Sequence, residues 1–395
     1  MTRDTIIVTD GEQRSALAAV RSLGRAGYRC VVTSATGHSL AGASRFAARD
    51  ASVPDALSEP AAFAASLTAL VTRERARAVF PMTDAAILAL APVRGALGDC
   101  VLPVPPLDQF RALSDKEHLL RIAGSTGIHV PAQVSLIDAR AASSLDAGAL
   151  SYPVVIKPAR SVGEAGGVRR KLGVEYAADA NALRASIAGL PAAAYPVLLQ
   201  QRIVGPGIGI FLLVWNGDVI AEFAHRRITE KPPSGGVSVY RESIPMDAAL
   251  LAQSRVLLQH FSWSGVAMIE YKRDDATGRA YLMEINGRFW GSLQLAIDAG
   301  VDFPALLAGV ALGKPVVPVR EYRAGVRSRW WWGHVDHLIA RMKSHDEWPP
   351  GTAGAARVAA DAVGGVLRSG DREEIFRWSD PRPFIRESIN WVLRR

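Results

Sequence analysis

Residues 280–291 read AYLMEINGRFWG, and this stretch is the most informative part of the sequence. Tyr281 to Ile285 form a mostly apolar run, typical of a strand with a buried face. Because side chains two positions apart on a strand point the same way, Glu284 and Asn286 present oxygen ligands of the kind Mg2+ prefers to one side. Arg288 follows on that side if the chain stays extended, where it would suit a phosphoryl group. The plain structural alternative is an ion pair between Glu284 and Arg288.

A second acidic strand precedes this one in the sequence. Gly265 to Lys272 read GVAMIEYK and carry Glu270 near their end. Residues 274–278, DDATG, have the composition of a hairpin turn. A hairpin would place Glu270 beside Glu284, and two carboxylates in register repel unless a cation lies between them. The pair therefore favours a metal site made by Glu270, Glu284 and Asn286.

The runs GVAMIEYKR (265–273) and LMEINGRFWGS (282–292) together resemble the metal-binding end of the ATP-grasp superfamily. The likeness is greatest to carboxylate–amine ligases related to the large chain of carbamoyl-phosphate synthase and to biotin carboxylase. It implies that ATP lies between two sheets and that a carboxylate substrate is phosphorylated before a nucleophile attacks it. It also implies ATP and Mg2+ as cofactors, with Mn2+ as a possible substitute, and Arg288 as a catalytic residue.

Length and composition are those of a globular protein of two or three domains, with 395 residues, 49% hydrophobic and 21% charged. No run of about 18 apolar residues indicates a membrane span, and the N-terminus lacks the layout of a signal peptide. The two cysteines, Cys30 and Cys100, fit a reducing cytoplasm. The formal charge of +8 comes without a basic, aromatic-rich arm, so small anionic ligands are expected and nucleic acid is not. A homodimer is compatible with these observations.

Residues 1–106 are expected to form a Rossmann-like α/β domain, which the resemblance also implies. Thr5–Thr9 is a short apolar strand, a helix-like segment covers Ser15–Leu23, and a second strand follows in a βαβ pattern. The first strand is not followed by G-x-G-x-x-G, which argues against a dinucleotide fingerprint. Asp10 and Asp84 lie in loops at the carboxyl ends of predicted strands. They would line the acceptor site or, as we favour, cap helices.

The proline-rich run 102–106 is predicted to link this domain to an ATP-grasp domain at 107–318. Ser114 is expected to cap the next helix, with Glu117 three residues later as the second member of a capping box. By the resemblance, Lys116 on this helix reaches the nucleotide phosphates.

A lid subdomain at about 150–203 follows by the same resemblance. Tyr152–Pro158 is predicted as a strand that ends near Lys157, whose ammonium is costly to bury without an anion. The next segment is rich in glycine, so its backbone N–H groups can surround phosphate oxygens, although a plain hairpin is the alternative. The candidate nucleotide-binding residues are Lys157, Ser161, Gly163, Gly166 and Gly167.

The resemblance assigns adenine binding to the strand Val197–Gly205 through Gln200, Gln201 and Ile203. Members of the family usually carry Glu where Gln201 stands, and an acidic ribose ligand soon afterwards. This chain continues instead with GPGIG at 205–209, so the residue that contacts ribose is not predicted.

A hairpin is predicted for Phe211–Phe223, around the turn Asn216-Gly217-Asp218. It leads into HRRITEKPPSGGVSV (225–239), which resembles the same subgroup of ligases. By that resemblance, Arg226 or Arg227 is a catalytic residue at the γ-phosphate and the acyl phosphate. The sequence leaves open which of the two points inward, and a solvated basic turn is the alternative.

Residues 319–395 are expected to form a Trp- and Arg-rich C-terminal extension. The consecutive Trp330, Trp331 and Trp332 cannot share one face of a helix or strand, so some would lie in the core and others at a substrate or partner surface. Residues 335–342 and 376–395 are predicted helices, with membrane-surface binding by the second as a minor alternative.

The expected activity is that of an ADP-forming ligase that joins a small carboxylate to a small amine through an acyl phosphate, making an amide or peptide bond. The alternatives are a biotin-carboxylase-like carboxylation and a nucleotide-binding regulatory protein without ligase turnover.

Overall fold

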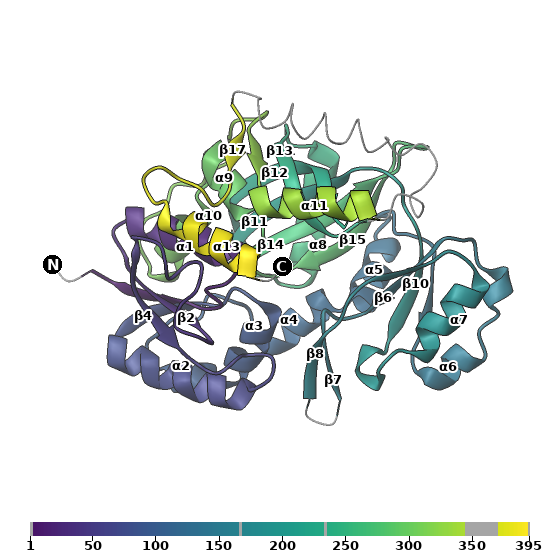
Figure 1. Cartoon of the computed structure of the whole chain (residues 1–395), viewed down its shortest axis with the longest axis horizontal. Coiled ribbons are helices and arrows are strands. Elements are labelled where there is room, and N and C mark those ends of the chain that lie inside the picture. Colours follow the sequence, from purple (N-terminus) through teal and green to yellow (C-terminus); the bar gives the residue numbers. More distant parts are fainter. Residues whose placement is uncertain (1–2, 166–167, 233–234, 344–369, 394–395) are drawn as a thin grey trace.

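The computed structural model describes residues 3–165, 168–232, 235–343 and 370–393. Its N-terminal part is an open parallel sheet in the order β3-β2-β1-β4 (Figure 1). Ile6 packs with α1 on one face and Ile7 packs with α2 on the other, because side chains alternate along a strand. The predicted α/β class is confirmed here. The elements are β1 Thr5–Val8, α1 Arg14–Arg25, β2 Arg29–Ser34, β3 Ala47–Ser52, α2 Pro60–Glu74, β4 Ala76–Phe80, α3 Asp84–Leu90 and the 3-10 helix η1 Ala91–Leu97.

The second sheet is small and antiparallel, in the order β5-β10-β6-β9. A separate two-stranded hairpin, β7–β8, projects beside it (Figure 1). The predicted lid range of about 150–203 contains three strands of this sheet, and β5 lies before it. The elements are β5 Gln133–Leu136, α6 Ala139–Ser143, η2 Ala147–Ala149, β6 Val154–Pro158, β7 Val162–Ala165, β8 Val168–Lys171, β9 Glu175–Ala177, α7 Ala180–Ala188, η3 Ala192–Ala194 and β10 Val197–Gln201.

A seven-stranded sheet, in the order β15-β14-β11-β12-β13-β16-β17, is the centre of the molecule. Alternate residues of β11 serve its two faces: Phe211 packs with α9, α10 and α1, and Leu212 packs with α5 and α8. The elements are α4 Leu107–Ser114, α5 Lys116–Ser125, β11 Gly207–Trp215, β12 Asp218–Lys231, β13 Val237–Ser243, α8 Ala248–His260, β14 Gly265–Arg273, β15 Ala280–Asn286, α9 Leu293–Ala299, α10 Phe303–Ala311, β16 Arg327–Arg329, α11 Trp331–Lys343, β17 Arg372–Glu373 and α13 Arg382–Leu393.

Both predicted hairpins of this sheet are present. Asn216 and Gly217 connect β11 to β12 with φ values of 51° and 90°. Positive φ at both central residues is the signature of a type I′ turn, for which Asn-Gly is the preferred pair. β14 and β15 form the second hairpin, which carries the acidic residues.

The C-terminal residues complete the sheet and join it to the N-terminal part. β16 and β17 extend its edge, and Phe384 of α13 packs against the core cluster that contains the buried residues of α1. The consecutive tryptophans diverge as expected. The Arg14 guanidinium lies 4.0 Å from the Trp330 ring centre, whereas Trp332 stacks on Trp391 at 4.2 Å.

The predicted helix cap at Ser114 is wrong. Ser114 is the last residue of α4, and Asp115 caps α5 by accepting a hydrogen bond from the His118 backbone N–H at 3.2 Å. The reason is that a second helix, α4, begins directly after Pro106 and includes Ser114. The extended residue between α4 and α5 is Asp115, so Asp115 occupies the cap position. The run 102–106 contains no helix or strand, as predicted, but Arg94 donates to three of its carbonyl groups.

In the described part of the chain, no single helix has the length and apolar composition needed to cross a membrane. The short helices α9 and α10 meet that criterion only as a pair, and they are bent by 92° relative to each other.

Candidate active site

The predicted pair of neighbouring carboxylates, Glu270 and Glu284, is present, and we call it the acidic row. Glu270 on β14 pairs directly with Glu284 on β15. The register shifts immediately after this pair, because Tyr271 pairs with Leu282 and Met283 is left over as a β-bulge. The Met283 carbonyl accepts a hydrogen bond from Lys157 Nζ at 3.3 Å. The bulge therefore ties the small sheet to the large sheet at the acidic row.

Glu284 lies between two lysines from different parts of the fold. Its Oε2 is 3.5 Å from Lys116 Nζ on α5 and 3.4 Å from Lys157 Nζ on β6. Asn286 Nδ2 donates to its Oε1 at 3.0 Å. Burial acts to raise the pKa of Glu284, but Lys157 and Lys116 outweigh it and hold the pKa below its ordinary value. The carboxylate is thus ionised and oriented.

Arg227, and not Arg226, faces the acidic row. Arg227 pairs with Glu270 and also with Glu230, at 2.9 Å, and its side chain is 12% exposed. Burial acts to lower the pKa of Arg227, but the two carboxylates outweigh it and raise the pKa. Arg226 points to the opposite face of β12, where it pairs with Glu242 at 2.6 Å and is 53% exposed. The alternation of a strand settles the orientation that the sequence left open.

Gly207 explains how Arg227 reaches Glu270, which lies two strands away. A Cβ on Gly207 would lie 2.9 Å from Arg227 Cδ, so only glycine leaves room for this side chain to cross β11. The GPGIG run at 205–209 thus has a packing role that the sequence interpretation missed. Its glycines were the available signal.

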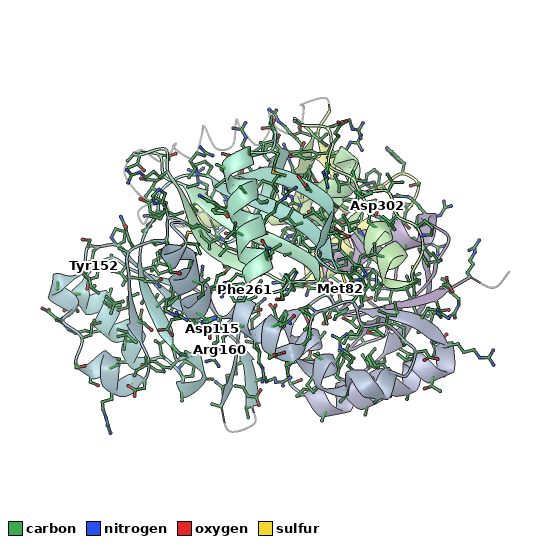
Figure 2. The ribbon with its side chains drawn as sticks, turned by 180° about the vertical axis from the view of Figure 1, so that it is seen from behind. Met82, Asp115, Tyr152, Arg160, Phe261 and Asp302 are labelled. Carbon is green, nitrogen blue, oxygen red and sulfur yellow. The ribbon has the colours of Figure 1, made fainter. Side chains whose placement is uncertain are left out.

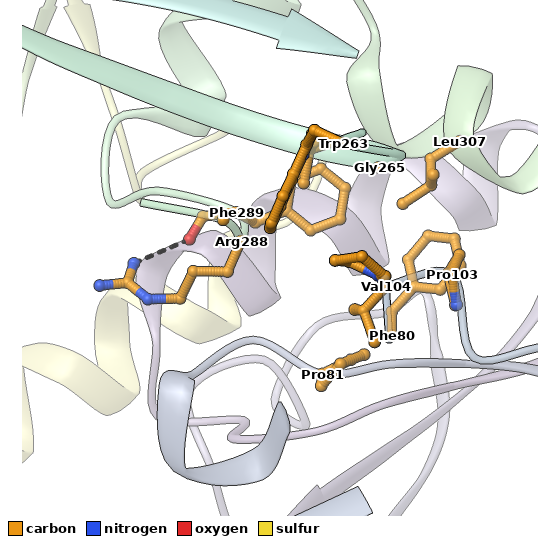
Figure 3. A pocket seen from close by; sticks show the side chains of 12 residues that line it. Phe80, Pro81, Pro103, Val104, Trp263, Gly265, Arg288, Phe289 and Leu307 are labelled. Carbon is orange, nitrogen blue, oxygen red and sulfur yellow. Dashed lines mark hydrogen bonds between the residues drawn. The ribbon is translucent and has the colours of Figure 1, made fainter. Parts of the chain in front are cut away.

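Arg288 lies two residues after the end of β15, and its guanidinium donates hydrogen bonds to three groups. Its Nε donates to Asp84 Oδ2 at 3.2 Å, its Nη2 to Asn286 Oδ1 at 3.1 Å and its Nη1 to the Phe289 carbonyl at 3.0 Å. Figure 3 shows the guanidinium directed away from the apolar cluster that includes Trp263 and Phe80. The predicted alternative, a pair between Glu284 and Arg288, is not what the structure contains.

Asp10 and Asp84 are not the helix caps that we favoured. The cap residue of α1 is Gln13, and that of α3 is Thr83, whose side chain accepts from the Ala86 N–H. Asp84 is the first residue of α3 and contacts Arg288 instead. Asp10 accepts a hydrogen bond from Thr83 Oγ1 at 3.0 Å, and burial raises its pKa. Because Thr83 is the cap residue of α3, the Asp84 side chain does not cap the helix and pairs instead with Arg288, which follows the acidic strand β15.

A cavity of about 760 Å³ opens beside this cluster, between α3, the α4–α5 junction, β7 and the end of β15. Asp115 and Arg160, which pair at 3.2 Å, are two of its lining residues (Figure 2). The polar residues that line it are Asp84, Arg111, Ser114, Asp115, Lys116, His118, Arg160, Ser161, Glu164, Glu284 and Asn286. Of the predicted phosphate-binding and metal-binding residues, Lys116, Ser161, Glu284 and Asn286 thus share this cavity with Asp84 of the N-terminal part.

The predicted phosphate loop is mostly hairpin. Ser161 lies at its start and accepts a hydrogen bond from Lys116 Nζ at 3.3 Å. Gly163 belongs to β7, where an added Cβ would lie 2.2 Å from the Ala193 carbonyl oxygen, so its glycine is required for packing. Gly166 and Gly167 lie outside the described residues. A phosphate contact of this segment stays a prediction.

The three predicted adenine-binding residues lie apart from this cavity. Gln200 is buried on β10 and donates to Gln133 Oε1 at 2.7 Å. Gln201, at the end of the strand, is exposed, and Ile203 is buried. β10 pairs with β6, and Leu198 lies opposite Lys157, which connects these residues to the site through the small sheet. Their role in binding adenine stays a prediction.

The donor set suits a metal ion that arrives with a nucleotide. Within the ranges that the structure describes, no group of three or more His, Cys, Asp and Glu side chains is arranged to hold a metal ion. Glu270, Glu284 and Asn286 supply two carboxylates and an amide, all oxygen donors, and phosphate oxygens would complete the shell of Mg2+. These residues therefore fit Mg2+ bound together with ATP better than Mg2+ bound alone.

Comparison with known proteins agrees with this geometry. Residues 194–333 match the family model described as ATP-grasp in the biosynthetic pathway with Ter operon. No curated protein sequence matched the chain.

Solved structures share the fold over most of the chain. The L-amino acid ligase of Bacillus licheniformis is 18% identical with a TM-score of 0.63, covering 80% of this chain and 76% of that one. The biotin carboxylase domain dimer of the Hydrogenobacter thermophilus 2-oxoglutarate carboxylase, in complex with MgADP, ADP and bicarbonate, is 15% identical with a TM-score of 0.64, covering 83% and 74%. The N5-carboxyaminoimidazole synthetase of Staphylococcus aureus, complexed with ADP, is 14% identical with a TM-score of 0.62, covering 82% of each chain.

The β14–β15 hairpin with Glu270 and Glu284, Lys116 of α5 with Lys157 of β6, and the match of residues 194–333 lead to one assignment: the chain has the ATP-grasp fold, and residues 194–333 match an ATP-grasp family model.

Proposed function

We propose that this protein is an ADP-forming carboxylate–amine ligase that makes an amide or peptide bond through an acyl phosphate. One observation carries the proposal: Lys116 and Lys157 contact Glu284, Arg227 pairs with the neighbouring Glu270, and Glu284 and Lys116 line the 760 Å³ cavity. Such a concentration of cations around two carboxylates suits a nucleotide triphosphate and its metal ion.

Each side chain has a role set by its place. Glu270, Glu284 and Asn286 would hold Mg2+ or Mn2+, which, when bound, neutralises charge on the β- and γ-phosphates. Lys116 and Lys157 would bind phosphate oxygens. Their positively charged ammonium groups already contact Glu284, the proposed metal ligand, so they lie near the phosphates of a metal-bound nucleotide. Ser161 and the β7–β8 hairpin would cover the phosphates from the lid side.

The proposed reaction has two steps. A carboxylate oxygen of the first substrate attacks the γ-phosphorus, and ADP leaves with the electron pair of the broken P–O bond. The neutral amine nitrogen then attacks the acyl carbon: the C–N bond forms, the C–O bond to phosphate breaks with its electron pair leaving on the phosphate, and the nitrogen releases one proton to the departing phosphate or to water. Arg227 and Arg288 would stabilise the charge on the transferring phosphoryl group and on the tetrahedral intermediate. Catalysis would consist mainly of positioning and charge neutralisation.

The test begins with a screen for phosphate release from ATP over pools of carboxylates and primary amines. We expect ADP and phosphate as products, with 18O from a labelled carboxylate appearing in the released phosphate. Glu284→Gln should still bind ATP but lose at least about 100-fold in turnover, because an ionised oxygen ligand of the metal is lost. AMP as the main product, unlabelled phosphate, or wild-type turnover by the variant would overturn the proposal.

The two alternatives give different results in the same screen. A biotin-carboxylase-like enzyme would release ADP with bicarbonate and biotin, without an amine substrate. A regulatory nucleotide-binding protein would bind ATP and release no ADP with any pool.

A further inference from the structure

Asp84 is the one residue of the N-terminal sheet domain that brings a carboxylate to the cavity wall. It begins α3, just after β4, at the carboxyl end of the parallel sheet. Its side chain is 19% exposed, whereas that of Lys116 nearby is 7% exposed. Ligands of open α/β sheets bind at this end of the strands. The position is therefore suited to contact a substrate.

The other carboxylates at the cavity have protein partners that account for them. Asp115 caps α5 and pairs with Arg160, Glu164 pairs with Arg169, and Glu284 lies between two lysines. Asp84 contacts Arg288 Nε through Oδ2 at 3.2 Å, so its Oδ1 is able to accept hydrogen bonds from a ligand at the same time. A carboxylate here repels an acidic substrate and attracts a cation.

The wall beside Asp84 is apolar. Leu88 lies four residues later on α3, and residues four apart lie on the same face of a helix. Phe110 and Ala112 of α4 and Val162 of β7 line the same cavity. A ligand whose charged end contacts Asp84 would thus have an apolar body.

We propose that Asp84 binds the ammonium group of the acceptor amine, which loses one proton to water before its nitrogen attacks, and that the acceptor is a small primary amine with an apolar body lying against Leu88 and Val162. The inference rests on the proposed function. It gives a second role to the acid of the N-terminal part that accepts a hydrogen bond from Arg288 Nε at 3.2 Å, because an amine bound at Oδ1 would lie close to the arginine proposed to act on the phosphoryl group. The alternative is that Asp84 only positions Arg288. In that case, the loss of Asp84 would lower hydroxamate and amide formation equally.

The experiment separates acyl phosphate formation from amine binding. Hydroxylamine is uncharged near pH 7 and captures acyl phosphates as hydroxamates, whereas butylamine is protonated and has an apolar body. Both nucleophiles are used with the first active carboxylate. Asp84→Asn should raise the KM for butylamine about 10- to 100-fold, because a charge-assisted hydrogen bond is lost. Its rate of hydroxamate formation should stay within about threefold of wild type.

Two further variants sharpen the result. Asp84→Glu keeps the charge and should recover most of the affinity for butylamine. Asp108→Asn makes the same chemical change on exposed α4 surface, outside the cavity lining, and should leave both rates unchanged.

Three outcomes would overturn the inference. If Asp84→Asn lowers hydroxamate and amide formation equally, Asp84 acts only through Arg288. If it changes neither rate, Asp84 does not contact the amine. If wild type forms hydroxamate but does not accept butylamine, the apolar amine is the wrong class. A wild-type protein that releases no ADP with any carboxylate contradicts the proposed function itself, which is a separate result.

Discussion

Two adjacent arginines on β12 have opposite surroundings, and a single substitution at each tests the proposed site. Arg227→Gln removes the cation that pairs with Glu270, so turnover should fall at least about 100-fold. Arg226→Gln alters only a half-exposed pair with Glu242, so turnover should stay within about threefold. Steady-state ADP release from both variants is the measurement. Equal losses in the two variants would contradict the assignment of Arg227 to the site.

At the scale of elements, the β7–β8 hairpin is the proposed cover of the phosphates. Among the described residues its two strands pair only with each other, and an isolated two-stranded hairpin is only marginally stable in water. Backbone hydrogen exchange of residues 161–171 should therefore slow when ATP and Mg2+ bind, because phosphate contacts hold the hairpin closed. The helix α8, which packs on the large sheet and contributes no residue to the cavity lining, serves as the internal control. Equal exchange of the hairpin with and without nucleotide would exclude the lid role.

At the scale of the molecule, the C-terminal residues hold the N-terminal part against the large sheet. Asp380 is 1% exposed and accepts hydrogen bonds from Arg21 at 2.9 Å, Ser44 at 2.7 Å and the Arg45 backbone at 2.9 Å. Asp380→Ala leaves the Arg21 charge buried without this partner, which should reduce the unfolding free energy by about 3 kcal/mol.

Thermal and urea unfolding would measure this effect. Asp99→Ala, the same substitution at an exposed residue, should change the unfolding free energy by less than about 0.5 kcal/mol. The double variant Arg21→Met with Asp380→Ala should recover part of the loss, because no buried charge remains unpaired. A loss as small as that of the control would mean that the buried pair does not join the two parts.

The sequence by itself determined the local features whose signals repeat over short distances. The apolar runs at 265–272 and 281–285 predicted both strands, and DDATG predicted their turn, so the Glu270–Glu284 pair followed from the sequence alone. The Asn216-Gly217 turn was predictable for the same reason, since its backbone demands those residue types. The resemblance of these runs to ATP-grasp ligases extended the prediction to the fold, which is confirmed.

Only the tertiary structure decided which distant residues meet at the site. It directs Arg227 inward across Gly207, brings Asp84 to Arg288 over 204 positions of sequence, and shows a bulge that presents the Met283 carbonyl to Lys157. A strand pattern specifies that neighbouring side chains alternate, but not which face becomes the site. That choice depends on the packing of separate sheets, which is a property of contacts distant in the chain and leaves no period in the sequence.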